Sequence, residues 1–170
     1  MVKRIIAIGG EPASGKTSLM RGVLKNFDDL KKFKYKLVRG YYSAKQNIYI
    51  IGIYNNELFS GTDKLSMAVQ PNFIEFLPKT KDATILFEGD RLFNQSLFEK
   101  VDCQIFILET DDNIKHQRHI DRNDSQDQKF LKAKKTKIAN IKNKNNFELL
   151  INNSPSDLQK NTQKIFNYLK

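Results

Sequence analysis

Two glycines, a lysine and a threonine near the start of the chain have a spacing that can bind phosphate. They belong to the segment Gly10-Glu11-Pro12-Ala13-Ser14-Gly15-Lys16-Thr17. Glycines allow backbone conformations that a Cβ forbids, so the N–H groups of such a loop can converge on a phosphate in front of a helix N-terminus. Lys16 can then reach the outer phosphates, and the Thr17 hydroxyl can ligate Mg²⁺. This P-loop pattern predicts binding of a nucleoside triphosphate.

The residues on either side of the P-loop predict the elements that must position it. Ile5-Ile6-Ala7-Ile8 is short, apolar and rich in β-branched residues, which is typical of a buried strand. From Thr17 to Leu24 the apolar residues recur at helical spacing. Because strand, loop and helix follow in the required order, a chance glycine turn is the weaker alternative.

Carboxylates follow a second predicted buried strand, residues 83–87. The strand is continued by Glu88-Gly89-Asp90-Arg91. At the carboxyl end of a parallel strand, Glu88 and Asp90 would lie beside the P-loop. There they could hold Mg²⁺ or take a proton from an attacking hydroxyl. The alternative is a turn that carries two solvated acids, and the sequence does not decide which of the two would be the base.

A polar stretch after a third predicted strand, residues 104–108, contains two arginines. Arg118 and Arg122 are four residues apart and would share one face of a helix. Two guanidinium groups in this place suit a lid that closes over transferring phosphates. The alternative is an exposed helix stabilised by ion pairs, since Asp121 and Asp124 are close in sequence to the two arginines.

The composition indicates a single soluble globular domain with a strong positive charge. The chain has 170 residues, of which 39% are hydrophobic and 28% charged, and its net charge is +10. The single cysteine, Cys103, excludes an internal disulfide, and no apolar run is long enough to span a bilayer. The first predicted strand leaves no room for a signal peptide, so a cytoplasmic location is expected.

The positive charge concentrates in two runs. Residues 129–144 contain seven lysines and no carboxylate, and they predict a basic surface helix. That helix could follow a nucleic-acid backbone or could simply be solvated. The other run, Lys31–Lys36, is predicted to be a solvated connection, with contact to nucleic acid as the alternative.

The region between the first helix and the second buried strand predicts a hairpin and a loop. Residues 36–42 and 47–54 have strand-like patterns joined by a short polar link. The loop from Phe59 to Pro71 has a small polar centre between apolar flanks. Within it, Thr62 or Asp63 could cap a helix that begins at Lys64; the alternative is that Asp63 faces a substrate. Near the end of the chain, residues 147–153 predict a last strand before a final helix.

These pieces resemble, in this order, the P-loop small-molecule kinases, and in particular the nucleoside and nucleotide kinases. The matching segments are residues 10–17, residues 88–91, the pair Arg118 and Arg122, and residues 149–155. The resemblance implies an α/β, three-layer fold with a five-stranded, mainly parallel sheet and helices on both faces. It also implies a β-hairpin insertion, a basic lid over about residues 111–144, and transfer of the γ-phosphoryl group of ATP with Mg²⁺.

The resemblance also implies roles for individual residues. Those implied to bind ATP are Gly10, Glu11, Ala13, Ser14, Gly15, Lys16, Thr17, Ser18 and Arg118. Thr17 would hold Mg²⁺, with Glu88 or Asp90 as its partner and the other available as the base. The residues expected to neutralise the developing charge, besides Lys16, are Arg91, Arg118 and Arg122. Asp63 completes the expected catalytic set on the acceptor side.

The acceptor is the open question at this stage. The Phe59–Pro71 loop and the basic surface resemble phage-type P-loop kinases, including those that phosphorylate hydroxymethyluracil within DNA. A hydroxymethyl pyrimidine in DNA is therefore one expected acceptor, which would place a phage-encoded chain in the host cytoplasm. A kinase of free nucleosides or nucleoside monophosphates is an alternative, and a nucleotide-binding ATPase or switch without an acceptor is another.

Overall fold

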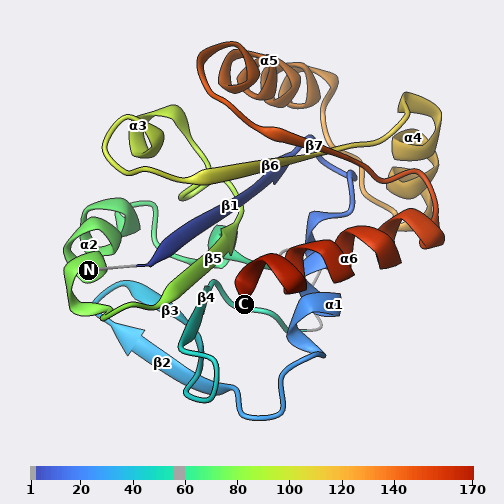
Figure 1. Cartoon of the computed structure of the whole chain (residues 1–170). Helices are drawn as coiled ribbons and strands as arrows, with labels where there is room; N and C mark the ends of the chain where they lie inside the picture. Colours follow the sequence, from blue (N-terminus) through green and yellow to red (C-terminus); the bar gives the residue numbers. More distant parts are fainter. Residues whose placement is uncertain (1–2, 56–59) are drawn as a thin grey trace.

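The computed structural model describes residues 3–55 and 60–170, and its centre is one seven-stranded sheet (Figure 1). The strands are β1 (Arg4–Gly10), β2 (Lys31–Tyr35), β3 (Val38–Ser43), β4 (Ile48–Ile51), β5 (Thr84–Glu88), β6 (Gln104–Glu109) and β7 (Glu148–Ile151). The helices are α1 (Lys16–Leu24), α2 (Val69–Phe76), α3 (Gln95–Phe98), α4 (Asp112–Asp121), α5 (Gln128–Lys144) and α6 (Pro155–Leu169). Their order across the sheet is β2-β3-β4-β5-β1-β6-β7.

The prediction of a five-stranded sheet with a hairpin insertion was wrong. The sheet is mixed and has seven strands, because β2 and β3 add an antiparallel edge to the parallel strands from β4 to β7. The run Lys31–Lys36, predicted as a solvated connection, is mostly strand β2. Its lysines alternate with Phe33 and Tyr35, which is the period of a strand, and Tyr35 pairs with Val38 of β3. The strand predicted over residues 36–42 accordingly begins two residues later.

Strand β4 also belongs to the main sheet and not to an inserted ribbon. It pairs in parallel with β5, where Ile48 lies opposite Thr84 and Ile51 opposite Phe87. The apolar character of both of its faces is explained by this position, since both sides of the sheet are covered there.

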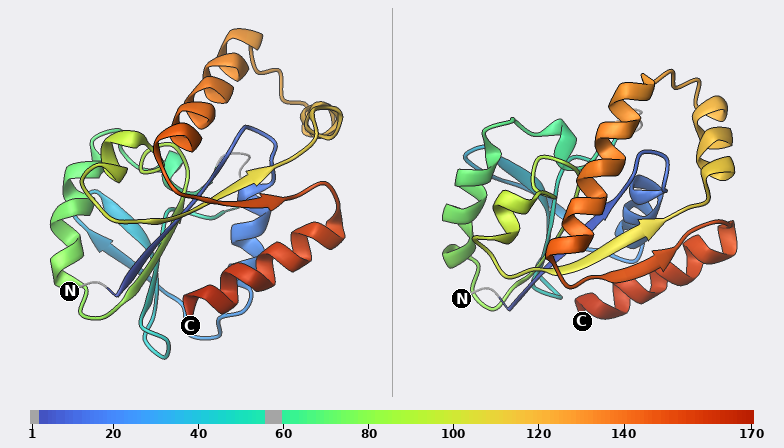
Figure 2. Two further views of the ribbon diagram at one scale, coloured as in Figure 1. Left: turned by 45° about the horizontal axis from the view of Figure 1, so that its top comes forward. Right: turned by 90° about the horizontal axis from the view of Figure 1, so that it is seen from above.

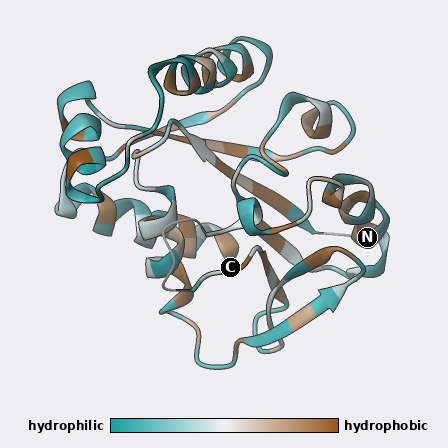
Figure 3. Cartoon of the chain, turned by 180° about the vertical axis from the view of Figure 1, so that it is seen from behind, coloured by the Kyte–Doolittle hydropathy of each residue, from teal (hydrophilic) through white to brown (hydrophobic). Residues whose placement is uncertain are grey.

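Helices cover the two faces of the sheet and form two separate cores. Successive residues of β1 point to opposite faces, so that Ile6 and Ile8 pack with α1 and α6, whereas Ile5 and Ala7 pack with α2, α3 and α5. In Figure 3 the hydrophobic residues accordingly concentrate on the central strands, and hydrophilic residues predominate on α4 and α5. The predicted final helix is confirmed, and its N-cap Ser154 accepts a hydrogen bond from the N–H of Asp157 at 3.1 Å.

The loop predicted over residues 59–71 begins outside the described residues and then makes a single 3₁₀ turn, η1 (Thr62–Lys64). The helix expected from Lys64 does not form there, because Leu65 has an extended backbone; α2 starts only at Val69. Neither Thr62 nor Asp63 supplies a side-chain cap to the turn. The Asp63 carboxylate is therefore available for the contact described below.

Helices α4 and α5 follow β6 and lie beyond the carboxyl edge of the sheet, next to the P-loop (Figures 1 and 2). Helix α4 buries none of its side chains, whereas α5 contributes Ile138 and Ile141 to the core. The N-terminal half of α5 projects away from the sheet (Figure 2). Among the helices of residues 3–55 and 60–170, none has both the length and the apolar character that crossing a bilayer requires.

Candidate active site

The P-loop connects the end of β1 to the first turn of α1, as the sequence predicts. Gly15, the residue before the helix, has a left-handed backbone with φ of 97°, and a Cβ in its place would collide with the amide of Asn152. The Lys16 ammonium donates to the carbonyls of Gly10 at 2.7 Å and Glu11 at 3.0 Å. Burial lowers the pKa of Lys16, and the nearby carboxylate of Glu88 opposes that effect.

A side chain after strand β7 and another from helix α4 support the P-loop backbone. Asn152, just after β7, donates from Nδ2 to the carbonyl of Ser14 at 2.7 Å. Arg118 of α4 donates from Nη1 to the carbonyl of Ala13 and from Nη2 to that of Asn152, both at 3.0 Å. Arg118, predicted to close over phosphates, is thus bound to the backbone of the loop itself.

Glu88 is the last residue of β5 and is buried, with 2% of its surface exposed. Its Oε1 accepts a hydrogen bond from the Tyr54 hydroxyl at 3.1 Å. Burial raises the pKa of Glu88 to about 7, although the ammonium of Lys16 acts in the opposite direction. Gly61, with φ of 80°, leaves room for this carboxylate, which a Cβ there would meet. A carboxyl group with this pKa can exchange a proton near neutral pH.

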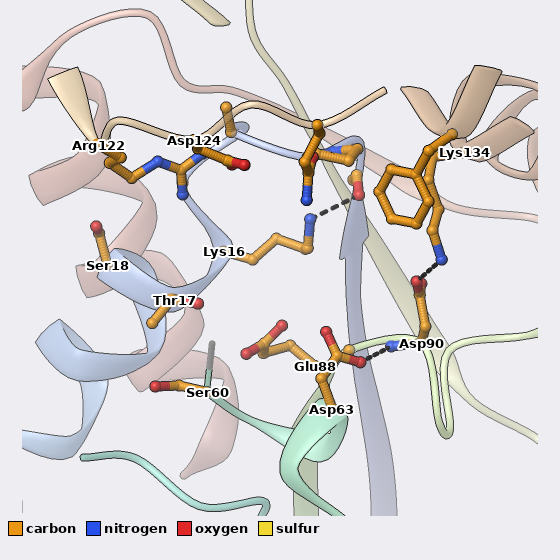
Figure 4. Close-up of a pocket in the computed structure, with 17 residues that line it drawn as sticks. Lys16, Thr17, Ser18, Ser60, Asp63, Glu88, Asp90, Arg122, Asp124 and Lys134 are labelled. Atoms are coloured by element: carbon orange, nitrogen blue, oxygen red, sulfur yellow. Dashed lines mark hydrogen bonds and ion pairs between the residues drawn. The ribbon is translucent and has the colours of Figure 1, made fainter. Parts of the chain in front are cut away.

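The two other carboxylates of the site are tied to different partners. Asp63 accepts a hydrogen bond at Oδ1 from the backbone N–H of Asp90 at 2.9 Å (Figure 4). The carboxylate of Asp90 forms ion pairs with Lys134 and Lys137 of α5; its Oδ1 lies 3.0 Å from the Lys137 ammonium. The pKa of Asp90 is lowered because these lysine contacts outweigh its partial burial.

Arg91 has a backbone partner outside the site. Its Nε donates to the carbonyl of Leu65 at 3.3 Å, and it does not line the cavity in front of the P-loop. Its expected role in neutralising phosphate charge therefore finds no support in this geometry.

A cavity of about 150 Å³, here called the phosphate cavity, lies in front of the P-loop. Lys16 and Thr17 line it from α1. Asp63, Glu88 and Asp90 line it from the opposite side, and Arg122 and Lys134 line it from the end of α4 and from α5 (Figure 4). A second cavity of about 610 Å³, here called the outer cavity, lies between α4 and the start of α6. The two share Ala13, Gly15, Ser18 and Arg122, so they form one continuous site.

The oxygen donors around the phosphate cavity suit Mg²⁺. Thr17 offers a hydroxyl, and Glu88 and Asp63 offer carboxylates; these are the hard ligands that Mg²⁺ prefers. Within residues 3–55 and 60–170 no group of three or more His, Cys, Asp or Glu has a metal-binding arrangement. Mg²⁺ in nucleotide sites typically takes one or two carboxylates plus phosphate oxygens and water, so the donor set still fits.

Most of the predicted site residues meet around the phosphate cavity. Those that line it are Gly10, Ala13, Gly15, Lys16, Thr17, Ser18, Asp63, Glu88, Asp90 and Arg122. Of the others, Ser14 is part of the loop and accepts the hydrogen bond from Asn152, and Arg118 binds the loop backbone. Glu11 forms an ion pair with Lys115 of α4 at 3.2 Å. Arg91 is the predicted site residue that lies away from the cavity, where it binds the carbonyl of Leu65.

Sequence reasoning missed several residues of the site. They are Tyr54, Ser60, Asp124, Gln126, Phe130, Lys134 and Asn152. Lys134 and Phe130 carried a usable signal, since they are four residues apart in the predicted basic helix and so share a face. Asn152 and Tyr54 carried none, because only the folded sheet brings strand ends together.

Comparison with models of known protein families and with curated proteins finds no match to this chain. The function must therefore be argued from the chemistry of the site.

Proposed function

We propose that the chain is an ATP-dependent phosphotransferase that moves the γ-phosphoryl group to a nucleotide-type acceptor. The observation that carries the proposal is the meeting, in one cavity, of the P-loop groups of Lys16 and Thr17 with the carboxylates of Glu88 and Asp63. A P-loop ATPase or switch also uses one carboxylate to hold Mg²⁺, whereas Glu88 and Asp63 together provide one carboxylate for the metal and one for a proton. A buried carboxylic acid whose pKa is near neutrality, opposite the P-loop, supports a reaction that moves a proton.

The donor would lie along the P-loop. Its base fits the outer cavity, and its phosphates reach the phosphate cavity past Gly15, where the N-terminus of α1 favours negative charge. The Lys16 ammonium would exchange its two carbonyl partners for phosphate oxygens. When bound, Mg²⁺ would be held by Thr17 with Asp63, which leaves Glu88 free as the base, and it would supply charge neutralisation for the outer phosphates.

The acceptor hydroxyl would attack the γ-phosphorus from the side of Glu88. The bond from phosphorus to the β,γ-bridging oxygen breaks, a bond to the acceptor oxygen forms, and ADP leaves with the bridging oxygen. The hydroxyl proton passes to the Glu88 carboxylate and then to solvent. Lys16 and Arg122 stabilise the charge that spreads over the transferring group, and positioning accounts for most of the rate.

The positive surface favours an acceptor that is part of a polyanion, and we propose a hydroxymethyl pyrimidine in DNA. Lys129, Lys132 and Lys135 are exposed on α5 at one side of the site. At the other side, Lys32 and Arg39 of the β2–β3 edge line a groove of about 410 Å³. Phosphate contacts from both sides could hold a strand across the cavity.

The test is transfer of labelled γ-phosphate from ATP to duplex DNA, to duplex DNA with hydroxymethyluracil, and to free nucleosides and monophosphates. Label on the modified DNA alone, with steep inhibition by salt, supports the DNA acceptor through counterion release. If a free nucleotide is labelled and the transfer is nearly insensitive to salt, the acceptor is a small metabolite and not DNA. Hydrolysis of ATP with no label on any acceptor would overturn the phosphotransferase and leave an ATPase.

A further inference from the structure

An exposed aromatic ring forms part of a cavity wall that is otherwise polar. Phe130, in the first turn of α5, has 41% of its surface exposed and lines the phosphate cavity. It does not belong to either hydrophobic core of the described residues. The exposed part of the ring gives the cavity wall an apolar face, on which a planar ligand could stack.

Phe130 lines the phosphate cavity and does not line the outer cavity. It lines the phosphate cavity together with Asp63, Asp90 and Lys134, and none of these lines the outer cavity, where the base of the donor fits. The ring therefore faces the acceptor side of the transferring phosphoryl group and not the donor base.

A chain of contacts holds the ring in this place. The Lys134 ammonium lies 5.0 Å from the centre of the Phe130 ring and forms an ion pair with Asp90 at the end of β5. Lys137, one turn further along α5, binds the same carboxylate at 3.0 Å. The N-terminal half of α5 projects from the body of the protein (Figure 2). The contacts of Asp90 with Lys134 and Lys137 therefore help to hold this part of the helix over the cavity (Figure 4).

The same cavity contains a buried polar group with no partner. The side-chain oxygen of Gln126 is buried and has no hydrogen-bond partner within residues 3–55 and 60–170, and Gln126 lines the same cavity. An unpaired buried amide is costly, and the cost is removed when a ligand supplies the partner. An amide and an aromatic ring that line one cavity are the combination that recognises the edge and the plane of a nucleobase.

We propose that Phe130 and Gln126 form the acceptor's base site, in which a planar nucleobase stacks on Phe130 and pairs its edge with the Gln126 amide. Asp90 acts as a positioning residue: through Lys134 and Lys137 it holds α5 where the Phe130 ring can stack on the base. This proposal rests on the proposed phosphotransferase function, because only that function makes the bound base part of an acceptor. The site itself can be tested without any transfer.

The direct test uses the absence of tryptophan from the chain. A Phe130→Trp variant carries one indole in the proposed site, and stacking of a base quenches its fluorescence. The matched control is Phe147→Trp, since Phe147 is a similarly exposed ring beside a lysine, 5.9 Å from Lys142, and does not line the phosphate cavity. The probes are 5-hydroxymethyl-2′-deoxyuridine, a single-stranded oligonucleotide that contains it, and the same oligonucleotide with an abasic residue there, each with a non-hydrolysable ATP analogue present.

We expect the nucleoside or the base-containing oligonucleotide to quench the fluorescence of the Phe130→Trp variant saturably. This quenching should be stronger than that by the abasic oligonucleotide and absent from the Phe147→Trp control. Equal quenching by the abasic oligonucleotide, or no quenching, overturns the base site. This holds whether or not phosphate transfer occurs, so failure of the base site is distinguished from failure of the phosphotransferase function.

Kinetics give the second readout with whichever probe accepts label. Phe130→Leu keeps an apolar side chain and removes the ring, and it is expected to raise KM for the acceptor about tenfold with KM for ATP unchanged, because base–aromatic stacking is worth about that much. Phe130→Tyr keeps the ring and should restore a KM near that of the wild type. Equal KM values for the Leu and Tyr variants would overturn the stacking role.

Discussion

The donor side and the acceptor side of the site are built from different kinds of contact. On the donor side, Asn152 and Arg118 bind backbone carbonyls of the P-loop, within a framework of adjacent parallel strands. On the acceptor side, α5 packs on the core through Ile138 and Ile141, and the part nearer the cavity is held by ion pairs between Asp90 and two lysines whose side chains are 26% and 29% exposed. Partly exposed ion pairs contribute little stability and weaken with salt.

This difference indicates which half of the site is already formed before any ligand binds. The P-loop has its shape before any nucleotide arrives, because its supporting hydrogen bonds are short and involve the main chain. The wall that carries Phe130 depends on charges that an incoming phosphate can attract away from Asp90. The donor site is therefore expected to resist changes of salt, and the acceptor site is expected to respond to them.

The largest effect is expected from removing the positive charge of the donor side. Lys16→Ala should lower kcat for transfer by roughly a thousandfold, since a buried cation that stabilises transition-state charge contributes on that order. The measurement is transfer of labelled γ-phosphate at saturating ATP. Lys144→Ala, which removes the same charge from the exposed end of α5, is the control and should leave kcat unchanged. Comparable turnover in the Lys16 variant would sink the proposed function.

Glu88→Gln should come next, with a loss in kcat of roughly a hundredfold and little change in either KM. The amide keeps the size of the side chain and a partner for the Tyr54 hydroxyl but cannot accept the acceptor's proton. Steady-state kinetics at pH 8 would measure it. Full activity in this variant would mean that the base is another group, with Asp63 the next to be tested.

Asp90→Asn should have a smaller effect, of a different kind. If Asp90 positions α5, its loss should raise KM for the acceptor by about three- to tenfold, the scale of a weakened charge contact, while KM for ATP stays constant. Added salt should reduce the difference from the wild type, because salt weakens the same ion pairs in the wild-type protein. A fall in kcat as large as that of Glu88→Gln would instead make Asp90 a catalytic residue.

The pH dependence of stability gives the most local test, because it concerns the charge of one side chain. Glu88 has a pKa of about 7 in the folded protein and an ordinary value of 4.5, so the fold favours its neutral form. Its contribution to the free energy of unfolding is fully present below pH 4.5 and is lost as the pH rises through 7, by about 3 kcal/mol. Urea unfolding of metal-free protein between pH 5 and 8 should show the wild type losing this stability relative to Glu88→Gln. Parallel curves would contradict the raised pKa.

The sequence predicted the donor side better than the acceptor side, for physical reasons. The P-loop is a local structure, so Gly10, Gly15, Lys16 and Thr17 carry its geometry in their own spacing. Buried strands with continuous apolar character, such as residues 83–87 and 104–108, were also recognisable and placed Glu88 at the correct edge.

The remaining features depended on contacts between distant segments. Strand β2 looked like a charged connection because its lysines mask the alternation that pairs it with β3. The pairing of Asp90 with Lys134 spans 44 residues, and that of Asn152 with Ser14 spans 138. No local pattern encodes such distances, so neither the positioning role of Asp90 nor the support of the P-loop by Asn152 could be derived from spacing alone.

Strand β2 has a consequence for the behaviour of the protein at high concentration. It forms one margin of the sheet, and its outer backbone groups are a template on which another chain could add a strand. Lys31, Lys32 and Lys34 are all exposed on this short strand, so two copies that approached edge to edge would bring like charges together. The same lysines that hid the strand from sequence patterns are thus expected to protect the protein from aggregation, and replacing them with threonine should promote fibre formation.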